Sequence, residues 1–296
     1  MDVKFANPPP FEGPPSLRER LVYAARAAWR RVRINRWVTS VLGPQYRRSR
    51  DAIEIDLTWA CNLKCLNCNR SVRQAPTGER MTLAQVQAFI DESRQSGLTW
   101  RKVRLVGGEP TLHPEFEAIV DLLCAWRDKL GGVMDIQVST NGHGDVVRDV
   151  LARIRGGVTI DDSAKEGNVQ PHFGDFNVAP RDLSEYQSAD YRNACWVAEG
   201  CGMGLTPYGY YPCAVAGGID RVLGLGLGRK RLPMLNDDML DEAAALCQWC
   251  GRFKTGHFVP RNLRPPLLEE RMSPSWIEAY AKWRERRPQL RRYEKP

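Results

Sequence analysis

The chain has 296 residues, with 43 lysines and arginines against 35 aspartates and glutamates, so its formal net charge is +8. This length can bury a sizeable core, either as one large domain or as a core with an appendage. No stretch approaches the roughly 18 uninterrupted apolar residues of a membrane span. Nine cysteines, an odd number, argue against a disulfide framework. We therefore expect a cytoplasmic protein whose cysteines bind metal.

Residues 1–50 form a basic extension that holds the whole net charge, with eleven cationic residues against three acidic ones. Ser16 followed by Glu19 predicts a capping-box start to a helix. Apolar residues then recur at helical spacing: Leu17, Leu21, Ala24, Ala28, Val32.

Two interpretations of this helix stay open. In the commoner arrangement it packs on the core and its arginines face solvent. In the other it touches an anionic membrane surface or an acidic partner peptide. No base-reading module accompanies the arginines, so we expect no nucleic-acid partner. Because every cofactor motif lies after residue 51, we expect the extension to be dispensable for cofactor chemistry.

A strand predicted at residues 52–57 leads into three cysteines, Cys61, Cys65 and Cys68, spaced C-x3-C-x2-C. Three thiolates are one too few for a structural zinc site. They suit a 4Fe–4S cluster whose fourth iron stays open for another ligand. An iron with a free coordination site indicates a catalytic cluster rather than a purely structural one.

Two polar loops follow the next predicted strands, at residues 102–106 and 133–138. These loops contain Gly107, Gly108 and Glu109 after the first strand, and Ser139, Thr140 and Asn141 after the second. Helices are predicted at residues 82–94, 114–129 and 146–155, and a short strand at 158–160. Strand–helix alternation predicts an α/β fold with parallel βαβ units. In such folds the loops at the carboxyl ends of the strands form the ligand site.

The triad and the two loops, in this order, resemble the radical S-adenosylmethionine (SAM) superfamily. The resemblance implies a partial (β/α) barrel over residues 51–194, shortened here because only about four βα units are legible. It implies that the open iron chelates SAM, that Gly107, Gly108 and Glu109 bind the methionine ammonium, and that Ser139, Thr140 and Asn141 contact the ribose and carboxylate. It also implies a flavodoxin or ferredoxin-type electron donor. Where the family often has an aromatic residue before the third cysteine, this chain has Asn67.

Candidate acid–base residues lie near the same loops. His143 sits between glycines after a strand, and histidine is the natural proton carrier near neutral pH. From Asp161 to about residue 193 the periodicity fades into a polar, proline-broken stretch, which is typical of a lid or substrate wall. Asp161 and His172 are the other candidate catalytic residues, and Lys165 is a candidate substrate contact.

A second group of cysteines lies in the segment 195–260: Cys195, Cys201, Cys213, Cys247 and Cys250. The run between Cys201 and Cys213 predicts a β-hairpin with its turn near residues 207–209. With the distant C-x2-C pair, it resembles the auxiliary "twitch" and SPASM appendages of radical SAM enzymes. The resemblance implies a second 4Fe–4S cluster. A zinc ribbon built from the same residues is the alternative.

Five cysteines are one too many for one cluster, and two assignments stay open. In the favoured assignment Cys201, Cys213, Cys247 and Cys250 ligate. In the other, Cys195, Cys201 and Cys213 ligate with one member of the C-x2-C pair. Four thiolates would make the cluster an electron conduit, whereas three would leave an iron that can hold substrate.

The last segment, 261–296, predicts a helix from residue 273 and a basic tail on the surface. The family resemblance implies a 5′-deoxyadenosyl radical that abstracts hydrogen. We expect a small polar substrate (a sugar, cyclitol or nucleotide-linked sugar) that is oxidised or rearranged. The alternative is a peptide maturase acting on a ribosomally made precursor. A non-enzymatic iron–sulfur or zinc-binding protein is a distant third.

Overall fold

One sheet runs through the computed structural model, which describes residues 4–5 and 13–294. Its strands are β1 (Lys4–Phe5), β2 (Ala52–Thr58), β3 (Trp100–Gly107), β4 (Val133–Thr140), β5 (Thr159–Asp162), β6 (Met203–Thr206) and β7 (Gly209–Tyr211). Their spatial order is β1-β5-β4-β3-β2-β6-β7. Every neighbouring pair is parallel except β6 and β7, which form the predicted antiparallel hairpin. The predicted α/β fold with a mostly parallel sheet is confirmed.

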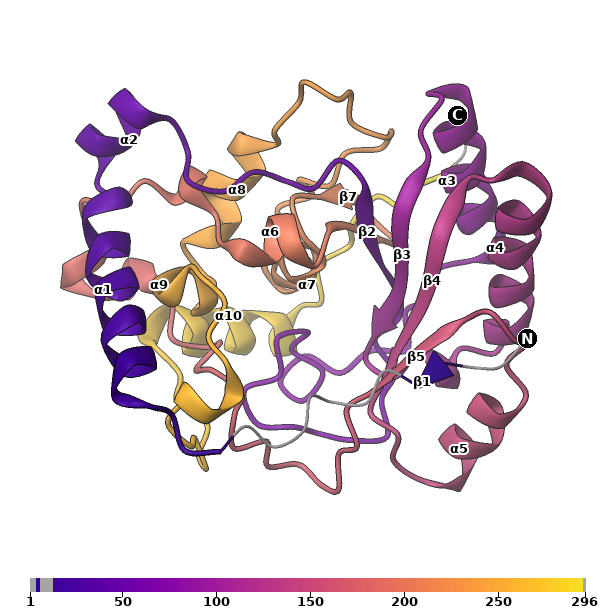
Figure 1. Cartoon of the computed structure of the whole chain (residues 1–296), viewed down its shortest axis with the longest axis horizontal. Helices are drawn as coiled ribbons and strands as arrows, with labels where there is room; N and C mark the ends of the chain where they lie inside the picture. Colours follow the sequence, from indigo (N-terminus) through magenta and orange to yellow (C-terminus); the bar gives the residue numbers. More distant parts are fainter. Residues whose placement is uncertain (1–3, 6–12, 295–296) are drawn as a thin grey trace.

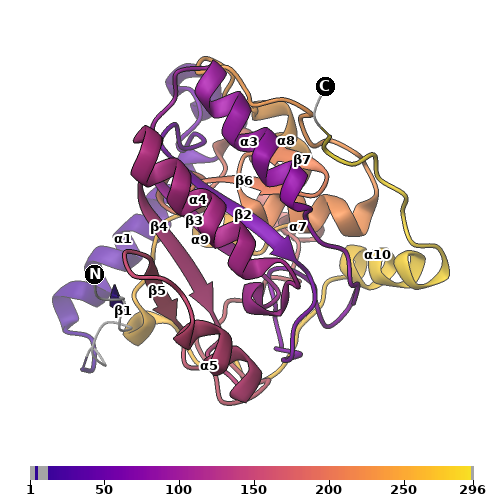
Figure 2. The ribbon, with the colours of Figure 1, turned by 90° about the vertical axis from the view of Figure 1, so that its right-hand side faces the viewer.

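Helices cover both faces of this sheet (Figures 1 and 2). On one face lie α3 (Leu83–Gln95), α4 (Phe116–Leu130) and α5 (Asp145–Ala152). On the other lie α1 (Leu17–Arg33), α2 (Arg36–Leu42), α6 (Trp196–Gly200), α7 (Ala214–Leu223), α8 (Leu240–Cys247), α9 (Arg252–Thr255) and α10 (Pro274–Glu285). Short 3-10 helices connect them: η1 (Pro110–Leu112), η2 (Pro180–Asp182), η3 (Ser184–Tyr186), η4 (Tyr191–Asn193) and η5 (Arg261–Leu263).

Alternation along β2 separates the two faces chemically. Ile53 and Ile55 are fully buried in the main apolar core with residues of α3 and α4. Glu54 and Asp56, at the intervening positions, are also buried but pair with Arg70, at 3.3 and 3.1 Å. Since successive strand side chains point to opposite faces, the face away from α3 and α4 is lined by charge. This charged face is turned toward the C-terminal half of the chain.

The helix starts follow the sequence signals closely. Ser16 Oγ accepts from the Glu19 N–H at 3.3 Å, and Glu19 Oε2 accepts from the Ser16 N–H at 2.8 Å, which completes the predicted capping box of α1. Thr82 and Gln85 form a second capping box at the start of α3. Each box satisfies backbone donors that the first helical turn leaves free.

The N-terminal helix, however, packs with the side opposite to the one we expected. Leu17 and Leu21 of the apolar stripe are 73% and 61% exposed, whereas Arg30 and Arg33 are buried. The Arg30 guanidinium donates to the carbonyl oxygen of Ala194 at 2.6 Å. Polar contacts to backbone carbonyls thus replace apolar packing, so the arginines of the helix do not all face solvent.

The basic C-terminal tail lies largely on the surface, as expected, with Arg284, Arg286, Arg287 and Arg291 exposed. One residue of the tail differs. Tyr293 is fully buried in the main core, and its N–H donates to Pro207 O at 2.8 Å. The hairpin that contains Pro207 extends the main sheet beyond β2. Parts of the segments 195–260 and 261–296 therefore belong to the same packed body as the sheet.

Candidate functional site

The loop after β3 crosses directly over the start of the cysteine loop. The Gly108 N–H donates to Thr58 O at 2.7 Å, and the Glu109 N–H donates to Ala60 O at 2.9 Å. Gly107 has φ +143°, and a Cβ on it would lie 2.3 Å from Thr58 O. A Cβ on Gly108 would lie equally close to Ala60 O. Both glycines are required by this close backbone crossing.

Glu109 fastens the loop after β3 to the loop after β4. Its fully buried carboxylate accepts from Thr111 Oγ1 at 2.7 Å, Thr140 Oγ1 at 2.9 Å and the Asn141 N–H at 2.8 Å. These donors give the carboxylate a positioning role inside the protein. That it binds the SAM ammonium stays a prediction.

Asn141 continues this connection to the cysteine loop. Its Nδ2 donates to Asn62 Oδ1 at 2.8 Å and lies 3.7 Å from Cys61 Sγ. The Leu63 N–H also points at Cys61 Sγ, at 3.4 Å. Donors aimed at a sulfur suit a thiolate ligand, because hydrogen bonds stabilise its negative charge.

The three cysteines of the triad line one cavity of about 60 Å³. Its other walls include Gly107, Gly108, Asn141, Lys165 and Phe173. Burial raises the pKa of Cys61 to about 11 and raises that of Cys65, where Lys165 opposes the effect. Three thiols on one wall and two polar loops on the other fit a three-thiolate 4Fe–4S cluster with an open side.

Four of the five later cysteines line a second cavity: Cys195, Cys213, Cys247 and Cys250. It measures about 20 Å³, and burial followed by their mutual repulsion raises the pKa of the last three thiols. All nine cysteines are free of disulfides. In the described part of the chain no group of three or more Cys, His, Asp or Glu side chains could hold a metal ion as placed, the triad included. The triad and the four later cysteines are each brought together by the cavity that they line.

Cys201 does not line this cavity, whereas both assignments made from the sequence include it. Burial raises the pKa of its thiol to about 11, and the next largest effects come from Glu54 and Arg104, on the charged face of the sheet. The short helix α6 separates Cys201 from Cys195, which lie at its C-cap and N-cap. Cys201 still packs against the apolar cluster that contains Cys195 and Cys250, so its role as a ligand stays a prediction.

None of the three candidate catalytic residues lines the triad cavity. His143 Nδ1 lies 3.1 Å from Lys165 O, so this nitrogen carries the proton and donates to the carbonyl. Asp161 accepts from Ser139 Oγ at 3.1 Å. His172 lies apart from both, and its Nδ1 is buried without a hydrogen-bond partner in the described part of the structure. Proton transfer by these residues stays a prediction.

Residues 55–163, which hold the triad and both loops, match the family model described as "Radical SAM superfamily". Over these residues the chain resembles a radical SAM domain. The relatives matched by this part of the chain are named as enzymes. The family implies a 4Fe–4S cluster and SAM as cofactors, and the residues around the triad cavity fit both.

Two curated relatives each match a part of this chain, and about a third of the aligned residues are identical. GTP 3′,8-cyclase of Pelotomaculum thermopropionicum is 31% identical over 99 residues, 33% of this chain and 29% of the cyclase. Mycofactocin maturase MftC of Mycobacterium ulcerans is 31% identical over 146 residues, 47% of this chain and 37% of the maturase. The matches thus span about a third of the length of these relatives. The crystal structure of BtrN in complex with AdoMet and 2-DOIA shares 15% identity, covers 71% of this chain and 86% of that one, and gives a TM-score of 0.36.

Asn67 occupies the position before the third cysteine, where radical SAM domains often have an aromatic residue. Its backbone is left-handed, with φ 55°, a conformation that asparagine tolerates better than bulky residues. Its N–H donates to Glu270 Oε1 at 3.0 Å, and its Nδ2 donates to Glu269 O at 2.9 Å. The departure from the family pattern therefore ties the cysteine loop to the C-terminal segment.

Only a weak signal in the sequence indicated the charged face of the sheet. Glu54 accepts from both Arg70, at 3.3 Å, and Arg104, at 3.2 Å. Burial raises the pKa of Asp56 to about 6, against the opposing charge of Arg70. Acidic residues at alternate positions of a predicted strand were the available signal, because they imply that one face of the strand is polar.

A third cavity of about 380 Å³ borders both cysteine sites. It shares Phe173 with the triad cavity and Arg252 with the four-cysteine cavity. Its volume lies in the usual range of small-molecule sites. Sequence reasoning missed Arg252, because nothing in the sequence around it connects it to either site.

Proposed function

We propose that this radical SAM enzyme abstracts hydrogen from a small polar substrate and uses a second 4Fe–4S cluster to accept an electron. When bound, the first cluster and SAM would supply a 5′-deoxyadenosyl radical, and the second cluster would supply an electron acceptor. Cys61, Cys65 and Cys68 would hold the first cluster. The four cysteines of the second cavity would saturate the other, which favours electron transfer over substrate binding.

The cavity that borders both cysteine sites carries this proposal. A substrate in it would have the triad cavity behind Phe173 and the four-cysteine cavity behind Arg252. Phe173 and Trp196 give this cavity aromatic walls, which help to exclude water from a reactive radical. Glu109 would act at a distance, by holding the two SAM loops together.

Iron content tests the cysteine assignment. Anaerobically reconstituted protein should hold about eight irons, as two 4Fe–4S clusters require. Cys195→Ala should leave about four, whereas Cys201→Ala, the matched control, should keep about eight. The reverse result would overturn the assignment. Stoichiometric zinc with only four irons would favour the zinc ribbon and contradict the second cluster.

Turnover tests the substrate class. The name of the cyclase relative supports a nucleotide or a related polar small molecule, in line with a sugar, cyclitol or nucleotide-linked sugar. The reconstituted enzyme should release 5′-deoxyadenosine faster when such a molecule is added, and a deuterium label should pass from substrate to 5′-deoxyadenosine. No transfer from any of them would contradict the proposal.

A peptide maturase is the second candidate. The match to a mycofactocin maturase, over 47% of this chain, favours it. A precursor peptide would then stimulate 5′-deoxyadenosine release where small polar molecules do not. Mass spectrometry of the peptide would show the loss of hydrogen that a crosslink or oxidation requires.

A further inference from the structure

The large cavity between the cysteine sites is rich in positive charge. Arg252, Arg264 and Arg271 line it, and its one lining carboxylate, Asp175, is paired with Lys254 at 2.7 Å. Among the described residues, no carboxylate forms an ion pair with any of the three arginines. Three guanidinium groups without a carboxylate partner in one cavity favour the binding of an anion there.

The positive charges of Arg252 and Arg264 repel each other. The Arg264 guanidinium is held by carbonyl groups, at 2.7 Å from Val259 O and 3.2 Å from His172 O, which leaves its charge unneutralised. Burial lowers its pKa, and among the neighbouring charges Arg252 contributes most to this shift. Arg252 Nε is itself buried without a hydrogen-bond partner in the described structure. A bound anion would relieve both the repulsion and the missing contact.

We propose that this cavity binds a phosphate or carboxylate group of the substrate, with Arg252 and Arg271 as its ligands. Guanidinium groups match both anions, because their planar N–H groups can donate in pairs. The apolar side chains of Phe173, Trp196 and Leu263 line the rest of the cavity and would hold the less polar part. That the bound molecule is the substrate rests on the proposed function, but the anion site does not.

Calorimetric titration of the full-length protein with inorganic phosphate, and separately with acetate, tests the site. We expect saturable binding of at least one of them, and the stronger arm identifies the anion. Arg252→Gln and Arg271→Gln should each weaken it by about tenfold, the loss of one charged contact. Arg94→Gln, on the exposed face of α3, is the matched control and should bind normally.

Absence of binding to both anions, or an equal loss in the Arg94→Gln control, would overturn the proposal. The same variants are then assayed for iron content. Arginine-dependent anion binding in a protein without a second cluster would refute the proposed function and leave the anion site standing. A complete second cluster without anion binding would refute the anion site and leave the proposed function standing.

A second inference comes independently from α1 and α2, whose outward faces are apolar. The exposed apolar side chains of this face are Leu17, Leu21, Val22, Trp29, Val32, Trp37, Val41 and Leu42. Trp37 and Val41, one helical turn apart on α2, are 83% and 81% exposed. Contiguous exposed apolar residues mark a site of interaction.

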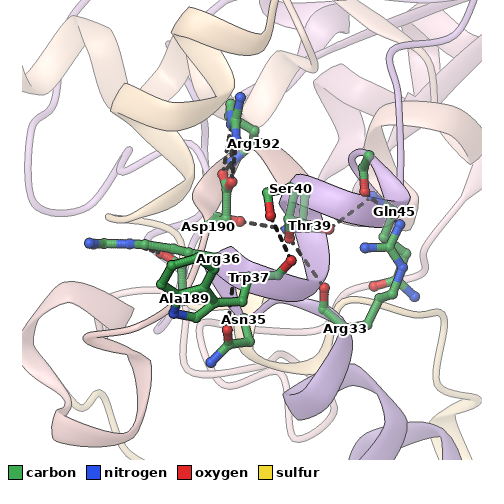
Figure 3. Close-up of polar contacts among 12 residues, drawn as sticks. Arg33, Asn35, Arg36, Trp37, Thr39, Ser40, Gln45, Ala189, Asp190 and Arg192 are labelled. Carbon is green, nitrogen blue, oxygen red and sulfur yellow. Dashed lines mark hydrogen bonds and ion pairs between the residues drawn. The ribbon is translucent and has the colours of Figure 1, made fainter.

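Polar contacts on the inner side hold α2 in this orientation (Figure 3). The buried Thr39 Oγ1 accepts from Asn193 Nδ2 at 2.6 Å, and the Asp190 N–H donates to Ile34 O at 2.7 Å. Asn35 caps the helix by accepting from the Trp37 N–H at 3.0 Å. The helix is thus anchored by polar groups inside and presents apolar groups outside, the reverse of an ordinary surface helix.

The surrounding charge indicates what this face meets. Exposed arginines flank the apolar residues: Arg18, Arg20, Arg26, Arg31 and Arg36. Residues 1–50 carry a net charge of +8, which opposes contact with a second copy of the same face. No helix in the described residues has the length and apolar character to cross a bilayer. We infer that α1 and α2 rest on an anionic lipid surface, with the tryptophans in the interface.

Co-sedimentation of the full-length protein with phosphatidylcholine vesicles, with and without phosphatidylglycerol, tests this. Binding should require the anionic lipid and weaken with salt, because screening reduces the attraction. Trp37→Ser with Val41→Ser should abolish most binding. Met134→Ser with Val146→Ser, equally exposed residues on β4 and α5 across the sheet, should not. Failure to bind, or a dimer that the α2 substitutions dissociate, would overturn the inference.

Discussion

Glu109 illustrates how one side chain can hold two loops of a site in place. Its carboxylate receives three strong hydrogen bonds from Thr111, Thr140 and Asn141. Glu109→Gln would place an amide N–H₂ among donors, so we expect a loss of about 1–3 kcal/mol in the free energy of unfolding. Urea denaturation measures this, and SAM binding should weaken with it. The exposed Glu115→Gln is the control. Weaker SAM binding at unchanged stability would instead show direct contact with the ammonium.

His113 predicts a pH dependence of stability. Its Nε2 donates to Met81 O at 2.7 Å and its Nδ1 accepts from the Glu115 N–H at 3.0 Å, an arrangement that requires the neutral ring. Burial lowers its pKa below the ordinary value near 6.5. As pH falls below about 6.5, the unfolded chain takes up a proton that the folded chain refuses. Stability should therefore fall, by at most about 1.4 kcal/mol per pH unit.

Urea unfolding between pH 7.5 and 5.5 measures this loss. His113→Gln can keep a donor and an acceptor at these positions but does not titrate, so its stability should change less over the same range. An equal decline in both proteins would assign the effect to other groups.

Single residues also show where sequence reasoning stops. The triad and Gly107 were predictable, because spacing and the need for a close backbone crossing are local properties. Cys201 and Arg252 were not, because their surroundings depend on how distant segments pack. A thiol spaced like a ligand can lie outside the cavity that the other thiols line, and an arginine without a motif can line two cavities.

At the scale of elements, α1 differs most from expectation. We predicted its start correctly from Ser16 and Glu19, but its packing side was wrong. Helical periodicity shows which residues share a face, not which face the protein buries. Here the buried Arg30 donates to the carbonyls of Ala194 and Phe253, two residues that line the four-cysteine cavity. The extension thus supports two residues of this cavity from outside, and we expect that it is not dispensable.

Arg30→Met tests this packing. Two buried carbonyls would lose a charged donor, so we expect a loss of about 2–4 kcal/mol in the free energy of unfolding. Iron should be lost from the second site and kept at the triad. Arg31→Met, an exposed neighbour, should change neither property. A stable Arg30→Met protein with full iron content would restore the original expectation.

At the scale of the whole molecule, one sheet joins segments that are distant in the sequence. Alternation of strands and helices predicted the central sheet from β2 to β5, with each boundary within a few residues. It did not predict that β6 would pair beside β2, or that β1 would pair beside β5, because neither contact is between neighbours in sequence. Pairing between distant segments is fixed by the assembled core and leaves no periodic signal.

The tail makes this assembly testable. Tyr293 packs in the main core, its hydroxyl lies 3.2 Å from Tyr210 Oη, and its carbonyl accepts from Gln85 of α3. Tyr293→Ala should cost about 3–5 kcal/mol, like the loss of other buried aromatic side chains. Tyr293→Phe, which keeps the ring, should cost about 1 kcal/mol.

Because the tail contacts both α3 and the hairpin, unfolding of one part should carry the other with it. Denaturation followed by far-ultraviolet circular dichroism and by cluster absorbance should therefore give coincident transitions in the parent protein, and Tyr293→Ala should shift both together. If only the cluster signal moved, the cluster-binding segment would unfold as a separate unit, and the sheet would not be the common support of both sites.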